Sequence, residues 1–266
     1  MALPEIKLRA GRATIEVERL SKSYRARGGD LLVFRDLSFT VEDESFVCVV
    51  GPSGCGKSTL LLCLSGLLPL SEGRVIIGGQ QITSPDPKTI GVIFQDANLL
   101  PWRTVTDNVG FPLELKGTAK KVWRARAMEY LELVGIADFA NAYPHELSGG
   151  MRQRAAIARG LVQDPTILLM DEPFAALDEQ TRMKMGVEVL RIWEQTRKTI
   201  VFVTHNLTEA VFLSDRVIVL GARPATILDD MPVDLGRPRT YDAMATEHFG
   251  LLRQRIWRQI GDLTPE

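Results

Sequence analysis

The sequence predicts an α/β fold whose core is a parallel sheet, and two observations predict it. The pattern G-x-x-x-x-G-K-[ST] occupies residues 51–59, directly after the apolar run Phe46–Val50 and directly before a leucine-rich helical run. Two further apolar runs end at the acidic pair 171–172 and at His205. Buried parallel strands are continuous apolar runs, and ligands bind at their carboxyl ends. We therefore expect the three strand ends to form one nucleotide site.

The loop at 51–59 has the chemistry of a phosphate site. Its residues are Gly51, Pro52, Ser53, Gly54, Cys55, Gly56, Lys57, Ser58 and Thr59. A strand that turns through glycines into a helix directs backbone N–H groups and the positive end of the helix dipole at one point, which suits phosphate oxygens. Lys57 supplies a point charge for the β- and γ-phosphates, and the Ser58 hydroxyl is suited to Mg²⁺. The same dipole predicts a thiolate at Cys55.

Composition limits the class of protein. The 266 residues fit one large domain or a domain with a subdomain, and 45% are apolar. A net charge of −1 gives no overall attraction to nucleic acid or to an anionic membrane. The three cysteines indicate reduced thiols in the cytosol. We expect neither a signal peptide nor a membrane span, so a second chain would span any membrane at which this one works.

The chain before the loop predicts an antiparallel pair. After a loose lead-in over 1–13, residues 13–24 and 32–41 alternate around a turn at 27–30. Tyr24 ends the first run, where its ring either stacks on a purine base or packs on neighbouring strand residues.

After the loop we expect a helix over 58–68 and strands over 73–77 and 90–94, the second stopping at Gln95. The charged segment 99–142 opens with Pro101-Trp102 and contains a helix over 120–134. It predicts a helical subdomain inserted between strands.

A second anion-binding nest is predicted at Ser148, Gly149 and Gly150, ahead of a basic helix. The alternative is a plain turn. Since the first loop already binds phosphate, the nest needs either another phosphate or the same phosphate approached from another subunit.

Strand ends supply the remaining groups. Asp171 is suited to orienting a metal and Glu172 to polarising water, the alternative being a solvated acidic strand end. His205 follows the run at 199–204 and would reach a terminal phosphate, although a single histidine at a strand end is commonly structural. A strand at 216–220 is followed by a tail, which we expect to be a loop with Pro232 and Pro238 and then an amphipathic helix. That helix docks on its own domain or meets a lipid or partner surface.

Taken together, these motifs resemble the ATPase subunit of ATP-binding cassette (ABC) transporters from about Ile15 to Leu220. The matching positions are Tyr24 for the adenine-stacking aromatic, 51–59 for the Walker A loop, Gln95 for the Q-loop, 147–153 for the signature motif, 167–172 for the Walker B strand, 175–178 for the D-loop and His205 for the switch histidine. The run 95–102, the pairs 104–105 and 108–109, and Met151 resemble the nitrate, sulfonate and taurine importer group.

The resemblance implies a P-loop NTPase (RecA-like) core with an antiparallel β subdomain and an inserted α-helical subdomain. The ATPase domain would span 14–225, with the helical part at about 98–164 and a tail at 226–266. Implied roles are catalysis for Glu172, His205 and Gln95, ATP binding for Tyr24, 51–59, Ser148, Gly149 and Gly150, and Mg²⁺ binding for Ser58, Gln95 and Asp171.

The implied partners are a second copy joined head to tail by ATP, membrane permeases at the cytoplasmic face of the inner membrane and, indirectly, a solute-binding protein, with no nucleic acid. The solute would be a small anion or an organosulfur compound. Ala175, Asn206 and Glu44 depart from the family pattern. The alternative function is that of a soluble ABC ATPase that clamps nucleic acid or assembles clusters. The second nest, followed by Asp171 and Glu172, argues against a P-loop kinase or GTPase.

Overall fold

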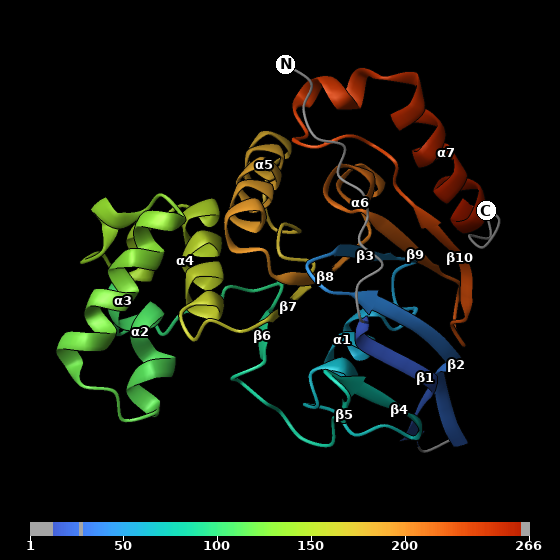
Figure 1. Cartoon of the computed structure of the whole chain (residues 1–266), viewed down its shortest axis with the longest axis horizontal. Helices are drawn as coiled ribbons and strands as arrows, with labels where there is room; N and C mark the ends of the chain where they lie inside the picture. Colours follow the sequence, from blue (N-terminus) through green and yellow to red (C-terminus); the bar gives the residue numbers. More distant parts are fainter. Residues whose placement is uncertain (1–12, 27–28, 262–266) are drawn as a thin grey trace.

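The computed structural model describes residues 13–26 and 29–261, so most of the lead-in and half of the 27–30 turn lie outside it (Figure 1). Its larger sheet has the strand order β10-β9-β3-β8-β7-β6. The bounds are β3 Phe46–Val50, β6 Ile90–Ile93, β7 Ile167–Asp171, β8 Thr199–Thr204, β9 Arg216–Leu220 and β10 Ile227–Pro232. Every pairing from β9 to β6 is parallel, which confirms the predicted core.

The smaller sheet has the order β2-β1-β4-β5 and is antiparallel, as predicted. Its strands are β1 Ala13–Ala26, β2 Gly29–Glu42, β4 Glu72–Ile77 and β5 Gln80–Gln81. Helix α1, Lys57–Leu64, packs with both sheets in one apolar core, to which Leu60 and Leu64 contribute.

The prediction that the helix after the loop extends to residue 68 is wrong. Helix α1 ends at Leu64, and the chain turns at Gly66, where φ is +73°. A Cβ on Gly66 would lie 2.7 Å from the backbone of Ser84, so this turn requires glycine. The continuing leucines at 67–68 concealed the end of the helix in the sequence.

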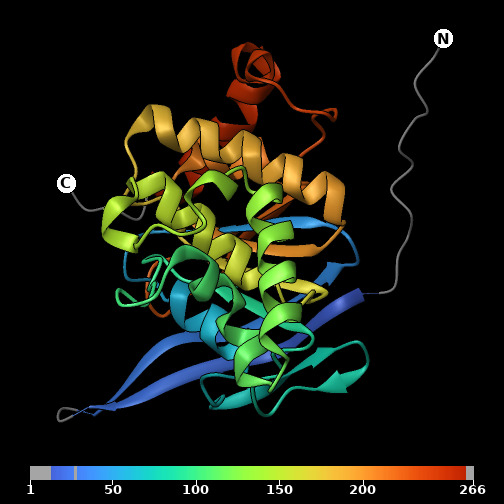
Figure 2. The ribbon, with the colours of Figure 1, turned by 90° about the vertical axis from the view of Figure 1, so that its left-hand side faces the viewer.

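The inserted helical subdomain lies between β6 and β7 in the chain and to one side of the larger sheet (Figures 1 and 2). It comprises α2 Val105–Leu115, α3 Lys120–Leu133, η1 Ala137–Phe139, η2 Pro144–Glu146 and α4 Gly149–Leu161. A Cβ on Gly110 of α2 would lie 2.2 Å from the Trp123 ring of α3. The absence of that Cβ lets the two helices approach closely.

The C-terminal part contains a strand that the sequence analysis missed. After α5 Glu179–Thr196 and α6 Leu207–Leu213, the segment expected to be a loop with Pro232 forms β10, antiparallel to β9. This is an edge strand in which only Met231 is buried, and Pro232 ends it, a position where proline costs no ladder hydrogen bond. The sheet therefore continues beyond residue 225.

The tail ends in η3 Tyr241–Ala245 and α7 Glu247–Gly261. As one of the two expectations had it, α7 docks on its own domain, burying Phe249, Leu252 and Ile256 in the core that also holds α6. Of the residues described, none forms a helix that is both long and apolar enough to cross a membrane.

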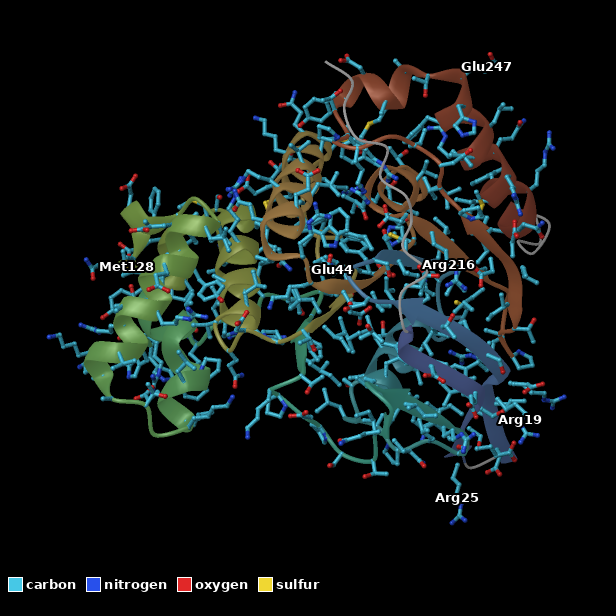
Figure 3. All side chains as sticks on the ribbon, viewed as in Figure 1. Arg19, Arg25, Glu44, Met128, Arg216 and Glu247 are labelled. Atoms are coloured by element: carbon cyan, nitrogen blue, oxygen red, sulfur yellow. The ribbon has the colours of Figure 1, made fainter. Side chains whose placement is uncertain are left out.

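The turn between β2 and β3 explains one departure from the family pattern. Glu44, labelled in Figure 3, has φ +56°, in the left-handed region that favours glycine. Its N–H donates to Thr199 Oγ1 at 3.0 Å. The position therefore needs a left-handed backbone, and here a hydrogen bond to β8 helps to hold it.

Candidate active site

The phosphate loop folds around its own lysine. Lys57 is only 5% exposed, and its Nζ donates to the carbonyls of Gly51 at 3.0 Å and Pro52 at 3.2 Å. Gly56 has φ +112°, and a Cβ there would lie 2.4 Å from Val33 Cγ1 of β2. The smaller sheet thus covers the loop at a position where only glycine fits.

Ser58 and Asp171 meet as a pair of oxygen ligands. The Ser58 hydroxyl, in the first turn of α1, donates to Asp171 Oδ1 at the end of β7 over 2.9 Å. Burial, with a smaller effect of the Glu172 charge, raises the pKa of Asp171 above its ordinary value. No group of three or more His, Cys, Asp or Glu residues suited to a metal occurs among the described residues. A hydroxyl and one carboxylate fit Mg²⁺, which prefers oxygen and completes its shell with phosphates and water.

Glu172 lies between the Lys57 ammonium and the His205 ring. Its Oε1 is 3.6 Å from Lys57 Nζ, and its Oε2 is 2.6 Å from His205 Nδ1. Its N–H donates to Val203 O of β8 at 2.9 Å, and its φ of +42° is uncommon for a residue with a side chain. The adjacent strands β7 and β8 thus bring the predicted acid and the predicted histidine together.

The His205 loop is held by residues that the sequence analysis did not single out. Thr204 Oγ1 donates to Glu209 Oε2 at 2.6 Å, and Glu209 Oε1 lies 3.5 Å from Arg182 Nε of α5. Burial raises the pKa of Glu209. Asn206, a departure from the family pattern, caps α6 by accepting from Thr208 N at 2.9 Å. No local sequence signal links Arg182 to Glu209, because they lie on different helices.

The second nest is a helix N-terminus packed on α5 and the turn before it. Ser148 caps α4 by accepting from Met151 N at 3.3 Å. A Cβ on Gly149 would lie 3.3 Å from Leu177 Cδ2, and one on Gly150 would lie 3.0 Å from Thr181 Cγ2. Among the hydrogen bonds and ion pairs of the described residues, none joins this nest to the phosphate loop.

Two predicted ligands stand apart from this cluster. Gln95 is exposed just beyond β6, and its side chain forms no hydrogen bond with the described residues. The Tyr24 ring is 39% exposed on β1, with Lys22 Nζ 5.1 Å from its centroid. The roles of Gln95 and Tyr24 stay predictions.

The expectation of a thiolate at Cys55 is wrong. This cysteine is 1% exposed, and burial raises its pKa despite the nearby Lys57. Desolvation outweighs the helix dipole and the ammonium charge.

A groove of about 440 Å³ separates the end of β6 from α2 and α4. Arg159 of α4 donates to Ala97 O at 2.6 Å and to Asn98 O at 2.7 Å, in the segment after Gln95. The buried Asn108 accepts from Leu100 N at 2.6 Å, so its amide shapes the next turn. The Arg159 contacts tie the groove wall to α4, the helix that begins at the second nest.

Comparison with known proteins identifies the family that has this geometry. The family model described as "ABC transporter" matches residues 34–175. A taurine import ATP-binding protein of Rhizobium johnstonii is 44% identical, over 91% of this chain and 94% of that protein. An aliphatic sulfonates import ATP-binding protein of Bacillus thuringiensis is 42% identical, over 92% and 95% respectively. An uncharacterized ABC transporter ATP-binding protein of Methanocaldococcus jannaschii is 48% identical, over 85% and 84%.

Solved structures agree with the fold. An ATP-binding cassette solved as a dimer in a post-hydrolysis state, bound to ADP and Pi, superposes with a TM-score of 0.74 and 31% identity. The match covers 84% of this chain and all of that one, 100%. The P-loop NTPase fold is therefore confirmed.

Proposed function

Because the chain belongs to the ABC transporter family as an ATP-hydrolysing subunit, we propose that it powers an importer for a small anion or an organosulfur solute. The relatives named for taurine and aliphatic sulfonates support this solute class. The position of Glu172 between Lys57 and His205, beside the Ser58–Asp171 pair, carries the proposal.

Each group of the cluster has a role in phosphoryl transfer to water. Lys57 exchanges its loop carbonyls for β- and γ-phosphate oxygens. Glu172 orients the attacking water, while His205 fixes the carboxylate and faces the transferring phosphoryl group. Ser58, Asp171 and Gln95 would hold Mg²⁺, which supplies charge neutralisation at the phosphates. The bond between the γ-phosphorus and the bridging oxygen breaks, and its electron pair leaves with ADP.

The nest supports a head-to-tail dimer. Ser148, Gly149 and Gly150 form the N-terminus of α4 and, within the part of the chain that the structure describes, make no hydrogen bond to the phosphate loop. In the proposed dimer they cap the γ-phosphate bound by Lys57 of the other copy, so that ATP joins the two subunits and hydrolysis releases them. The dimeric cassette among the solved structures supports the formation of a dimer.

The groove is the proposed contact with the permease. It lies between the Gln95 segment and α2, and Arg159 links its wall to the helix of the nest. A permease helix inserted in the groove would thereby sense opening and closing of the dimer at the cytoplasmic face of the membrane. A solute-binding protein would be only an indirect partner, acting through the permease. Trp102, 72% exposed beyond this segment, would add to the contact.

The test is Glu172→Gln, which keeps the shape of the side chain and removes its charge. ATP binding should survive, hydrolysis should fall by roughly two to four orders of magnitude, and a dimer should accumulate with ATP but not with ADP. Light scattering after size exclusion at high protein concentration measures the dimer. Glu132→Gln, at an exposed position of α3, is the matched control. Hydrolysis at the parental rate in Glu172→Gln would show that this carboxylate is not the group that orients water.

A further inference from the structure

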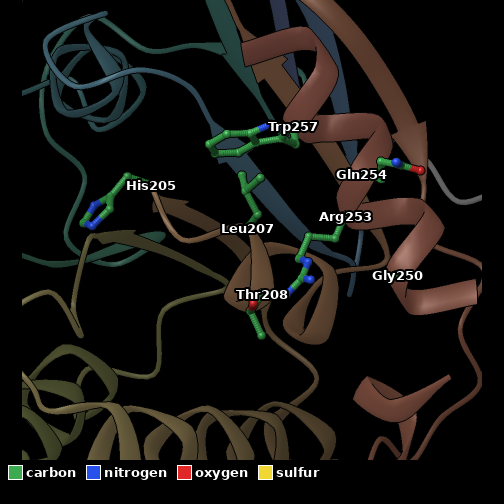
Figure 4. Close-up of a pocket in the computed structure, with 7 residues that line it drawn as sticks. All are labelled: His205, Leu207, Thr208, Gly250, Arg253, Gln254 and Trp257. Atoms are coloured by element: carbon green, nitrogen blue, oxygen red, sulfur yellow. The ribbon is translucent and has the colours of Figure 1, made fainter. Parts of the chain in front are cut away.

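A cavity of about 610 Å³ lies between α7 and the start of α6 and reaches His205. Figure 4 shows Arg253 and Trp257 projecting from α7 toward this space, with Trp257 above Leu207 and Arg253 beside Thr208. Trp257 is 64% exposed, which is unusual for the largest apolar side chain on a docked helix. Arg253 forms no hydrogen bond or ion pair with any residue that the structure describes.

Other arginines of α7 are used differently. Arg255 pairs with Asp229 of β10 at 2.7 Å, and so fastens α7 to the edge strand. Arg258 is exposed and lies outside the cavity. The tail therefore places one free guanidinium and one exposed indole along a cavity that His205 also lines.

The packing of the nest decides what faces this cavity in a dimer. Leu177 and Thr181 contact Gly149 and Gly150, so the turn before α5 and the first turn of α5 move with the nest. In the proposed dimer the partner's nest caps the γ-phosphate beside Lys57. Since Lys57, Glu172 and His205 are joined by contacts of 3.6 and 2.6 Å, the acidic segment packed on that nest would lie near His205. The partner segment carries Asp178, whose carboxylate caps α5, and Glu179, which lies 3.8 Å from Arg182 of its own helix and whose side chain stays 78% exposed.

We propose that Arg253 and Trp257 form a second contact with the partner copy, receiving the acidic first turn of its α5. The inference rests on the proposed ATP-joined dimer and extends its interface from the nucleotide to the tail. Opposite charges and an aromatic anchor are the features that such interfaces use. An interface of this kind would make the tail a sensor of the closed dimer.

Dimerisation of the Glu172→Gln protein in ATP provides the measurement. Arg253→Glu should raise the dimer dissociation constant about tenfold or more, and Trp257→Ala should raise it severalfold. Arg258→Glu repeats the charge reversal and Leu251→Ala removes another apolar side chain, both at exposed positions of α7 outside the cavity, and each should change it less than about twofold. Binding of a fluorescent ATP analogue to the monomer should be equal in all four, and thermal unfolding should show that all are folded.

A cross-link gives an independent readout. Copies carrying Arg253→Cys are mixed with copies carrying Glu179→Cys, since the three native cysteines are buried. A disulfide-linked dimer should form with ATP in the Glu172→Gln background and not with ADP. The inference is overturned if Arg253→Glu and Trp257→Ala leave the dimer dissociation constant unchanged, or if the two cysteine variants dimerise in ATP without forming the disulfide. Either result leaves the proposed function standing. Absence of any ATP-dependent dimer overturns both.

Discussion

The strand ends and the start of α4 both present groups that suit an anion. They differ in whether the groups needed for the reaction already lie together within one chain. At the strand ends, Lys57, Glu172 and His205 are already joined by contacts of 3.6 and 2.6 Å. The nest at Ser148 packs on α5 and, among the residues described, has no hydrogen bond or ion pair to the phosphate loop. The difference supports the proposed dimer, in which one copy binds ATP and hydrolysis requires the nest of a second copy.

The largest expected effect comes from disrupting the phosphate loop or the nest separately. Lys57→Ala removes the charge that holds the phosphates and should lower both ATP binding and hydrolysis, the latter at least about 100-fold. Ser148→Arg fills the nest and should lower hydrolysis similarly, while ATP binding to the monomer stays within about twofold. Nucleotide fluorescence and phosphate release measure the two quantities.

Mixing these two inactive variants tests the comparison most directly. In a mixed dimer, the intact loop of the Ser148→Arg copy faces the intact nest of the Lys57→Ala copy, so one complete site is restored. With half of the dimers mixed and one of two sites intact in each, about a quarter of the parental activity should return. No recovery would mean that loop and nest act within one chain, or that both sites must be intact.

A smaller effect is expected at the groove, which α4 joins to the nest. Trp102→Ala should weaken assembly with the permease about tenfold, because the ring is exposed and free for a partner, and should leave ATP binding unchanged. Trp123→Ala is the contrasting control, since this ring is 4% exposed against Gly110 and its loss should cost about 3–5 kcal/mol of stability. Co-purification with the permease and thermal unfolding separate the two outcomes. Unfolding of Trp102→Ala at a much lower temperature would place that ring in the core.

The smallest effect concerns the support of His205. Burial raises the pKa of Glu209, so the folded protein binds this proton more tightly than the unfolded chain, and the charged carboxylate destabilises the fold at neutral pH. This cost fades as pH falls through the raised pKa. Relative to Glu209→Gln, the parental protein should therefore gain stability between pH 7.5 and 5, as measured by thermal unfolding. A difference that does not change with pH would mean that Glu209 titrates normally.

Much of the site was predictable because the motifs lie at the ends of apolar strands. The run Ile167–Asp171 and the run Thr199–Thr204 predict neighbouring parallel strands, whose ends then bring Glu172 to His205. The missing pieces depend on tertiary contacts. Strand β10 contains Asp229 and Asp230, which oppose a strand assignment unless Arg255 and Arg216 are known to pair with them. Burial of Cys55 similarly depends on packing of the loop beneath the smaller sheet, which the loop sequence does not contain.

The left-handed backbone at Glu172 has a consequence for selecting more stable variants. A residue with a side chain in this conformation stores about 1–3 kcal/mol of strain, which glycine would relieve. Random substitution followed by screening for heat resistance should therefore recover Gly or Asn at this position, with hydrolysis abolished. With the role proposed for Glu172, thermostability and turnover oppose each other at one residue. A programme to stabilise this chain for structural work should then use inactive variants at position 172 and expect the active form to remain the less robust one.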